Sequence, residues 1–106
     1  MLDYIVCGAA ICLMVYAWGR LKKRAALGKF SEAKEHLTRK EYREALLLYQ
    51  EIAGEMRYET EYWYDLAITL AAMGSKADSL SALEKLFRLT PEHGPGRKLE
   101  HALKLN

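Results

Sequence analysis

Residues 60–91 read TEYWYDLAITLAAMGSKADSLSALEKLFRLTP, and they carry the clearest structural pattern in the chain. Gly74 divides it into two halves and Pro91 closes it, which predicts two helices joined by a tight turn. The same arrangement also stands earlier in the chain, and the two copies are related by a period of about 34 residues, a period typical of stacked helical repeats. The shared slots hold apolar or small residues: Ala33 and Ala67, Phe30 and Tyr64, Leu46 and Leu80, Leu48 and Ala82, Tyr49 and Leu83, Ile52 and Leu86.

The second copy resembles a tetratricopeptide repeat. Trp63-x2-Leu66-Ala67 reproduces the opening signature of that family, with Ala67 where many members have Gly, and Leu70, Ser79, Leu83 and Leu86 continue the pattern. The first copy is looser, since Lys29 stands where Trp is expected and Arg57 where Pro is expected. It keeps Ala33, Tyr42, Ala45, Tyr49 and Ile52. The resemblance covers residues 26–91 and implies a protein-binding surface rather than an enzyme. The alternative is an ordinary pair of helical hairpins whose match at this period is chance.

Small residues in these slots have a physical reason. Two antiparallel helices pack closely only where a small side chain lies at their crossing, and larger residues then fill the gaps on either side. Each hairpin leaves one apolar face uncovered, so stacking completes the core. Two repeats are fewer than the roughly three that such arrays need, so we expect further structure to cover the ends.

The predicted fold is all-α: an amino-terminal transmembrane helix followed by a short α-solenoid. The membrane helix and its basic flank occupy residues 1–24, and the helical domain occupies residues 25–106. The anchor helix can continue into the first repeat helix, which ends near Arg39. The predicted repeats are 26–59 and 60–93, with further helices over 42–56, 60–73 and 76–89. Ser75 and Asp78 predict a near capping box, Gly94-Pro95-Gly96 predicts a turn or helix break, and the stripe of Leu99, Ala102 and Leu103 predicts a capping helix over 96–105.

The membrane prediction depends on residues 4–19, which carry no charge and read YIVCGAAICLMVYAWG. Counted from Leu2 to Leu21, the segment is close to the roughly 20 residues that a spanning helix needs. Aromatic residues lie near both ends, where they favour the membrane interface. A cleaved signal peptide is the alternative, but such peptides carry positive charge before the apolar run, and only Asp3 precedes it here.

Four basic residues directly follow the apolar segment, namely Arg20, Lys22, Lys23 and Arg24. Basic residues stay on the cytoplasmic side, so they predict a single-pass protein with its repeats in the cytoplasm and a secondary attraction to lipid headgroups. A bacterial inner membrane is favoured, with the mitochondrial outer membrane as the alternative. Gly8 and Cys12 lie four residues apart and form a small-residue patch suited to contact with another membrane helix, although the same residues could simply face lipid.

The distribution of charge argues against a nucleic-acid partner. The net charge is +2, but residues 30–106 hold 11 basic and 13 acidic residues. A slightly acidic domain lacks the basic stripe that supplies non-specific affinity for nucleic acid. The histidines are scattered, no paired metal-ligand motif occurs, and no Gly-rich phosphate loop follows a strand. We therefore expect no enzyme, catalytic residue, cofactor, metal or small-molecule substrate.

In tetratricopeptide repeats the first helix of each repeat lines a concave groove that receives a peptide or helix. The resemblance therefore implies partner-binding positions at Phe30, Lys34, Leu37, Thr38, Glu61, Tyr64, Ile68, Ala71 and Ala72. Members that clamp an acidic carboxy-terminal tail have Lys and Asn in slots held here by Phe30, Lys34, Tyr64 and Ile68, and only one Lys is present, so that mode is disfavoured. An apolar groove with aromatic edges suits an amphipathic helix or an extended apolar segment. Phe30 and Leu37 could instead pack internally.

Two functional classes follow. The first is a membrane-anchored interaction module that acts as a scaffold, assembly factor or accessory subunit of a membrane protein complex. The second is a targeting or import receptor on an organelle surface, because the mitochondrial outer-membrane import receptor is similar in layout. In both classes the expected partners are proteins and membrane lipid.

Overall fold

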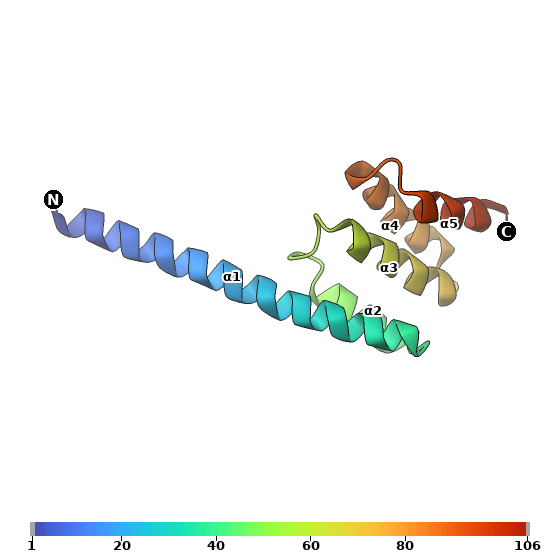
Figure 1. The fold of residues 1–106 in the computed structure, drawn as a ribbon, viewed down its shortest axis with the longest axis horizontal. Coiled ribbons are helices and arrows are strands. Elements are labelled where there is room, and N and C mark those ends of the chain that lie inside the picture. Colours follow the sequence, from blue (N-terminus) through green and yellow to red (C-terminus); the bar gives the residue numbers. More distant parts are fainter. Residues whose placement is uncertain (1, 106) are drawn as a thin grey trace.

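The computed structural model describes the backbone of residues 2–105 and the side chains of residues 10–105. Five helices follow one another: α1 (Leu2–Thr38), α2 (Tyr42–Glu51), α3 (Thr60–Ala72), α4 (Lys76–Leu89) and α5 (Gly94–Leu105). No strand occurs among residues 2–105, so this part of the chain is all-helical. Figure 1 shows α2 packed beside the carboxy-terminal part of α1 and α3, α4 and α5 stacked beyond α2, while the amino-terminal part of α1 projects away from them. The molecule measures 66 × 28 × 19 Å because of that projection.

The two predicted hairpins have small buried residues at equivalent positions. Ala33 on α1 and Ala45 on α2 are both fully buried, and the positions one period later in the sequence, Ala67 on α3 and Ser79 on α4, are fully buried as well. The Ser79 hydroxyl donates a hydrogen bond of 2.7 Å to the Ala67 carbonyl. Small side chains thus occupy both helix crossings, as the sequence pattern predicts.

The turns inside the two hairpins are also equivalent. Lys40 and Gly74, which are one period apart in the sequence, both have positive φ angles, of 63° and 83°. In each turn the residue after them donates its N–H to a carbonyl five residues back, from Glu41 to His36 and from Ser75 to Leu70. This is the Schellman arrangement that ends many helices, and Gly is the residue best suited to its left-handed position. The first hairpin makes the same turn with a lysine.

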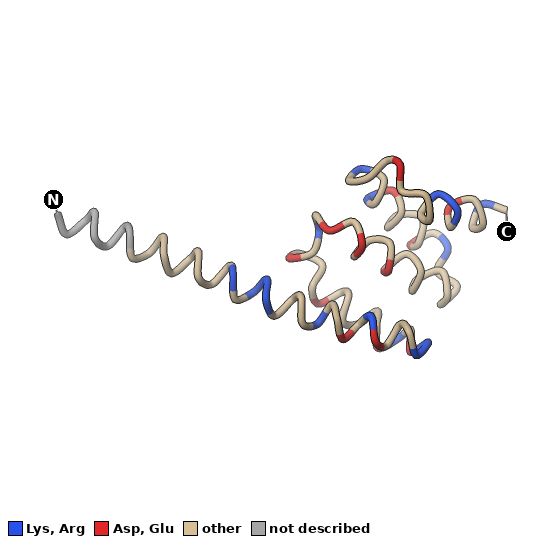
Figure 2. Tube along the Cα trace, viewed as in Figure 1, with Lys and Arg blue, Asp and Glu red and all other residues tan. Residues whose placement is uncertain are grey.

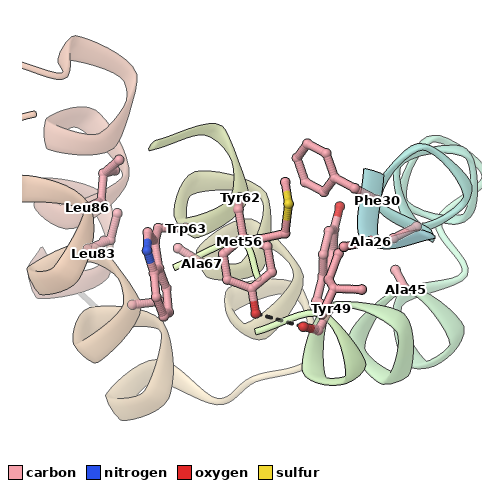
Figure 3. Packing of buried hydrophobic residues seen from close by; sticks show 13 residues of the cluster. Ala26, Phe30, Ala45, Tyr49, Met56, Tyr62, Trp63, Ala67, Leu83 and Leu86 are labelled. Carbon is pink, nitrogen blue, oxygen red and sulfur yellow. Dashed lines mark hydrogen bonds between the residues drawn. The ribbon is translucent and has the colours of Figure 1, made fainter. Parts of the chain in front are cut away.

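A continuous aromatic and aliphatic core joins the hairpins. Tyr49 on α2 and Tyr62 on α3 meet edge to face with their ring centroids 5.8 Å apart, and the Tyr62 hydroxyl donates to the Tyr49 carbonyl at 2.7 Å. Figure 3 shows this bond between the two helices, with Phe30 above the Tyr49 ring and Trp63 on the α4 side of Tyr62. The interface between the two units therefore contains both buried apolar surface and a satisfied hydrogen bond.

Three local expectations differ from the structure. The helix expected over 42–56 ends at Glu51, and the turns that follow place Met56 in the core, where it is 1% exposed. Ser75 occupies the N-cap position of α4 but its side chain makes no capping hydrogen bond. The Gly94-Pro95-Gly96 segment is the first turn of α5 rather than a break, which suits a proline because the first helical N–H groups need no partner within the helix.

Gly96 fixes how closely α5 approaches α4. A Cβ atom there would lie 2.7 Å from Leu86 Cδ2 and 2.9 Å from His93 Nδ1, which is closer than a carbon atom can pack. Its backbone N–H donates to His93 Nδ1 at 3.0 Å. The helix expected over 96–105 is therefore present as α5, and it covers the end of the second hairpin.

The amino-terminal prediction needs correction. No helix in the described part of the chain is long and apolar enough to cross a membrane. The uncharged run of the sequence, residues 4–19, corresponds to about 24 Å of helix, which is less than the hydrocarbon thickness of about 30 Å. Arg20 and its basic neighbours then follow within the same helix, as the blue segment of α1 in Figure 2 shows. The prediction of a transmembrane helix over residues 1–24 is therefore wrong, and so is the single-pass membrane location inferred from it.

Candidate functional site

The first helices of the two hairpins are joined at the surface by an ion pair. Lys34 on α1 pairs with Glu61 on α3, and its ammonium nitrogen also lies 3.9 Å from Asp65 Oδ2. The same nitrogen lies 4.7 Å from the centroid of the Phe30 ring beneath it. Lys34 is thus held between two carboxylates and an aromatic face, which fixes its position on this surface.

Asp65 is the residue of this cluster that the groove assignment missed. Its side chain is 13% exposed, and its Oδ2 atom is buried without a hydrogen-bond donor in the described part of the chain. Burial raises the pKa of Asp65 to about 6, while nearby Lys34 acts in the opposite direction. The signal in the sequence was its spacing: Asp65 lies four residues after Glu61 and therefore on the same side of α3.

Tyr49 is a second buried polar group close to this surface. Its hydroxyl is buried without a hydrogen-bond partner among the described residues. Burial raises the pKa of Tyr49, and the negative charges of Asp65 and Glu61 add to the effect. Burial likewise raises the pKa of Tyr62 to about 12. Both phenols therefore stay neutral at physiological pH and act as packing groups.

The apolar part of the predicted groove lies on α3. Tyr64, Ile68 and Ala71 are half-buried, and the Tyr64 ring lies 5.0 Å from the His93 ring, measured between centroids. His93 precedes α5, so the start of that helix borders the surface on one side. We call the combined surface of Lys34, Glu61, Asp65, Tyr64 and Ile68 the α1–α3 face.

The remaining predicted groove residues are placed differently. Phe30 is 8% exposed and packs against Tyr49 and Tyr62 at centroid distances of 6.0 and 6.3 Å, so its ring belongs to the core. Leu37 is half-buried against the same core. Thr38 is exposed and its hydroxyl donates to the Lys34 carbonyl at 2.9 Å. Ala72 is exposed at the end of α3. Phe30 is therefore withdrawn from the accessible surface, whereas Thr38 and Ala72 extend that surface by one helical turn beyond Lys34 and Ile68.

The residues assigned to membrane contact and to topology depended on the predicted membrane helix. Gly8 lies outside the residues whose side chains are described, and Cys12 is exposed. Of the residues assigned to topology and lipid contact, Arg20 and Lys22 lie over aromatic rings of their own helix, and Lys23 reaches Glu59 at 3.7 Å. Arg24 is exposed. Without a spanning helix these roles lose their basis.

The α1–α3 face has the chemistry of a binding surface. It offers one aromatic ring, one aliphatic side chain and a fixed arrangement of one cation and two carboxylates on helices held rigid by a buried core. In the described residues no three His, Cys, Asp or Glu side chains come close enough to share a metal ion.

Comparison with known proteins does not assign a family. No protein-family model matches the chain, and no curated protein matches it significantly.

Proposed function

We propose that this chain is a protein-interaction module of the tetratricopeptide-repeat type, which binds a segment of a partner protein along the α1–α3 face. In this role it serves as a scaffold, assembly factor or accessory subunit of a larger complex. The observation that carries the proposal is the equivalence of its two hairpins. They share buried small residues at both crossings and the same turn geometry at Lys40 and Gly74.

The equivalence supports binding because stacked hairpins repeat one surface along the array. In such arrays the first helices form an extended face, and partners lie across several units. Here Lys34 on α1 and Glu61 on α3 already lie within contact of one another, so a single bound segment would meet both hairpins. A face of this size suits a short helix or extended peptide rather than a whole domain.

The charges on this face point to the kind of segment. Lys34 is held by Glu61 and Asp65, so it offers no free cation for an acidic tail. Tyr64 and Ile68 provide apolar contacts beside the two carboxylates. A partner segment with apolar anchors and a basic residue fits this arrangement better than an acidic segment does. The alternative function, an organelle-surface receptor, depended on the membrane helix, and nothing in the described structure favours it.

Site-specific crosslinking tests the proposal directly. A photoreactive phenylalanine analogue replaces Tyr64 in one full-length variant and Leu47 in a control, since Leu47 is 57% exposed on α2 and lies away from the α1–α3 face. We expect the analogue at position 64 to crosslink a discrete protein partner in cells, and the one at position 47 to give none. Equal crosslinking from both positions, or none from either, would contradict the proposal.

The partner identified in this way permits a quantitative test. Tyr64→Ala is expected to weaken its binding by at least about tenfold, because central aromatic residues dominate interface energetics. Leu47→Ala should leave the affinity unchanged. Circular dichroism of both variants establishes that the helices are retained, so an unaltered affinity in the Tyr64→Ala variant would place the interface elsewhere.

A further inference from the structure

A concave surface separate from the α1–α3 face lies on the side of the molecule where α2 and α4 end. It is a depression of about 500 Å³ lined chiefly by Arg57, Tyr58, Trp63, Lys85, Arg88 and Leu89. This volume falls within the range of about 300–1,000 Å³ that is typical of ligand-binding clefts. Trp63 and Tyr64 are neighbours on α3 and so project about 100° apart around the helix, which separates this depression from the α1–α3 face.

The aromatic wall of the depression is held in place by the core. The Trp63 indole N–H donates to the Arg57 carbonyl at 2.8 Å, and the ring meets Tyr62 edge to face at 4.9 Å. Figure 3 shows Trp63 reaching from α3 toward Leu83 and Leu86 on α4. Tyr58, in contrast, is 71% exposed at the rim. The depression therefore combines a rigid floor with an exposed aromatic edge, a composition common at the centres of interfaces.

The charge of the lining is entirely positive. Arg57, Lys85 and Arg88 line the depression and no carboxylate does, although residues 30–106 as a whole carry two more acidic than basic residues. Arg88 is paired with Glu84 at 2.9 Å. Arg57 and Lys85 make no ion pair within the described part of the chain and lie over aromatic rings instead. The Lys85 nitrogen is 4.8 Å from the Trp63 centroid, and the Arg57 guanidinium carbon is 4.9 Å from that of Tyr58.

A purely structural role explains these cations only in part. Cations near a helix end stabilise its last carbonyls, and Arg88 lies in the last turn of α4. The Arg57 and Lys85 side chains, however, donate no hydrogen bond to those carbonyls in the described structure. Arg57 and Lys85 therefore lie over aromatic rings without a counter-charge from the described residues, so an anionic group of a bound partner can pair with them.

We propose that the depression between Arg57, Trp63 and Lys85 binds a partner segment in which a carboxylate side chain stands next to an apolar one. The carboxylate meets Arg57 and Lys85, and the apolar side chain packs on Trp63, Tyr58 and Leu89. The depression is small and residues 30–106 carry more acidic than basic residues, which would repel a phosphate backbone. A peptide is therefore favoured over a nucleic acid. The site is independent of the α1–α3 face, so the crosslinking experiment at Tyr64 can fail without affecting it.

The experiment uses Trp63 as its own reporter. The chain has two tryptophans, so Trp18→Phe in the full-length protein leaves one indole, and its fluorescence and its indole N–H resonance then report on the depression alone. The probes are libraries of hexapeptides, acetylated and amidated to remove terminal charges, with fixed alternating Glu and Leu positions. A matched library carries Gln in place of Glu, and a single-stranded oligonucleotide is tested in parallel.

We expect the Glu library to shift the Trp63 resonance and the Gln library to bind at least about tenfold more weakly, as charge-assisted hydrogen bonds predict. Lys85→Met and Arg57→Met should each reduce binding of the Glu library by about tenfold. Lys76→Met is the control, since Lys76 is exposed on α4 and does not line the depression. Each variant keeps the Trp63 hydrogen bond because that bond uses the Arg57 carbonyl. Equal binding of the two libraries, unchanged binding by both Met variants, or tighter binding of the oligonucleotide at Trp63 would overturn the proposal.

Discussion

Single alanine and serine positions set the distance between the paired helices. Ala33, Ala45, Ala67 and Ser79 are each fully buried, and they form two crossings at equivalent places in the two hairpins. At the second crossing the Ser79 hydroxyl reaches the Ala67 carbonyl, which requires the helix backbones to lie close together. A larger side chain at either position would have to displace a whole helix, since no space remains around it.

Ala67→Leu tests this packing. The three added carbon atoms overfill the α3–α4 crossing, and we expect the free energy of unfolding to fall by about 1–3 kcal/mol. Chemical denaturation followed by circular dichroism measures the loss. Ala72→Leu is the matched control because Ala72 is exposed on the same helix and should tolerate the change. Equal stability of the Ala67→Leu variant and the parent chain would show that Ala67 does not lie at a tight crossing.

Asp65 predicts an unusual dependence of stability on pH. Burial raises its pKa from 3.8 to about 6 in the folded chain. Between these two pH values the carboxyl group is ionised in the unfolded chain but still protonated in the folded chain. The free energy of unfolding therefore falls as the pH rises, and it levels off once the pH has passed the folded-state pKa of about 6. Asp65→Asn removes this loss. We therefore expect the melting temperature of the variant, relative to the parent, to rise from pH 4 to pH 7.

The control for Asp65→Asn is Asp78→Asn, an exposed acid in the first turn of α4. It removes the same charge without relieving a buried carboxylate, so its melting temperature should show no such relative gain toward neutral pH. A relative melting temperature of Asp65→Asn that stays constant from pH 4 to pH 7 would mean that Asp65 ionises normally in the folded chain.

Among the helices and turns, the two Schellman turns show where the repeat is imperfect. Gly74 adopts its positive φ without a steric cost, whereas Lys40 adopts nearly the same conformation with a side chain attached. A left-handed conformation costs a non-glycine residue on the order of 1 kcal/mol. The first hairpin therefore carries a local strain that the second hairpin avoids.

Exchanging the residues at these two turns measures that strain. Lys40→Gly is expected to raise the free energy of unfolding by about 1 kcal/mol, and Gly74→Lys to lower it by a similar amount. Denaturant titration of the full chain measures both changes, and Lys98→Gly, at an exposed position inside α5, serves as a control that should be destabilising. Destabilisation by Lys40→Gly would show that the Lys40 side chain contributes more than its backbone conformation costs.

At the scale of the whole molecule, α1 is divided into an exposed part that projects from the helical domain and a part that packs in its core. Its residues 10–25 are exposed around the entire helix, and the next residue, Ala26, enters the core with 3% of its surface exposed. Figure 1 shows the corresponding separation between the projecting part of α1 and the part packed beside α2. Stability should therefore reside in the residues from Ala26 onward.

Two truncations check this division. Deleting residues 1–20 should leave the melting temperature within about 4 °C of the parent value, since only exposed side chains among those described are lost. Deleting residues 1–30 should lower it by much more, because Ala26 and Phe30 leave the core. A large loss of stability from the shorter deletion would mean that the projecting part of α1 contributes to folding.

The local pattern of the chain was sufficient to predict the helical class and most helix ends, because these depend on residues close together in sequence. Gly74 and Pro91 mark their turns regardless of what lies around them, and Ala67 and Ala33 mark the crossings. The short α2 and the uncapped Ser75 show the limit of that information, since packing of Met56 into the core overrides the helical pattern there.

The burial of individual side chains and the charges around them could be known only from the packing of the helices on one another. Phe30 and Tyr64 occupy equivalent slots, yet Phe30 is in the core because Tyr49 and Tyr62 pack on it, whereas Tyr64 is half-buried beside His93. The raised pKa of Asp65 arises from burial among α1, α2 and α3, and the unpaired cations around Trp63 come from a loop and from α4. Equivalent positions in sequence thus differ in environment because each environment is made by residues distant in the chain.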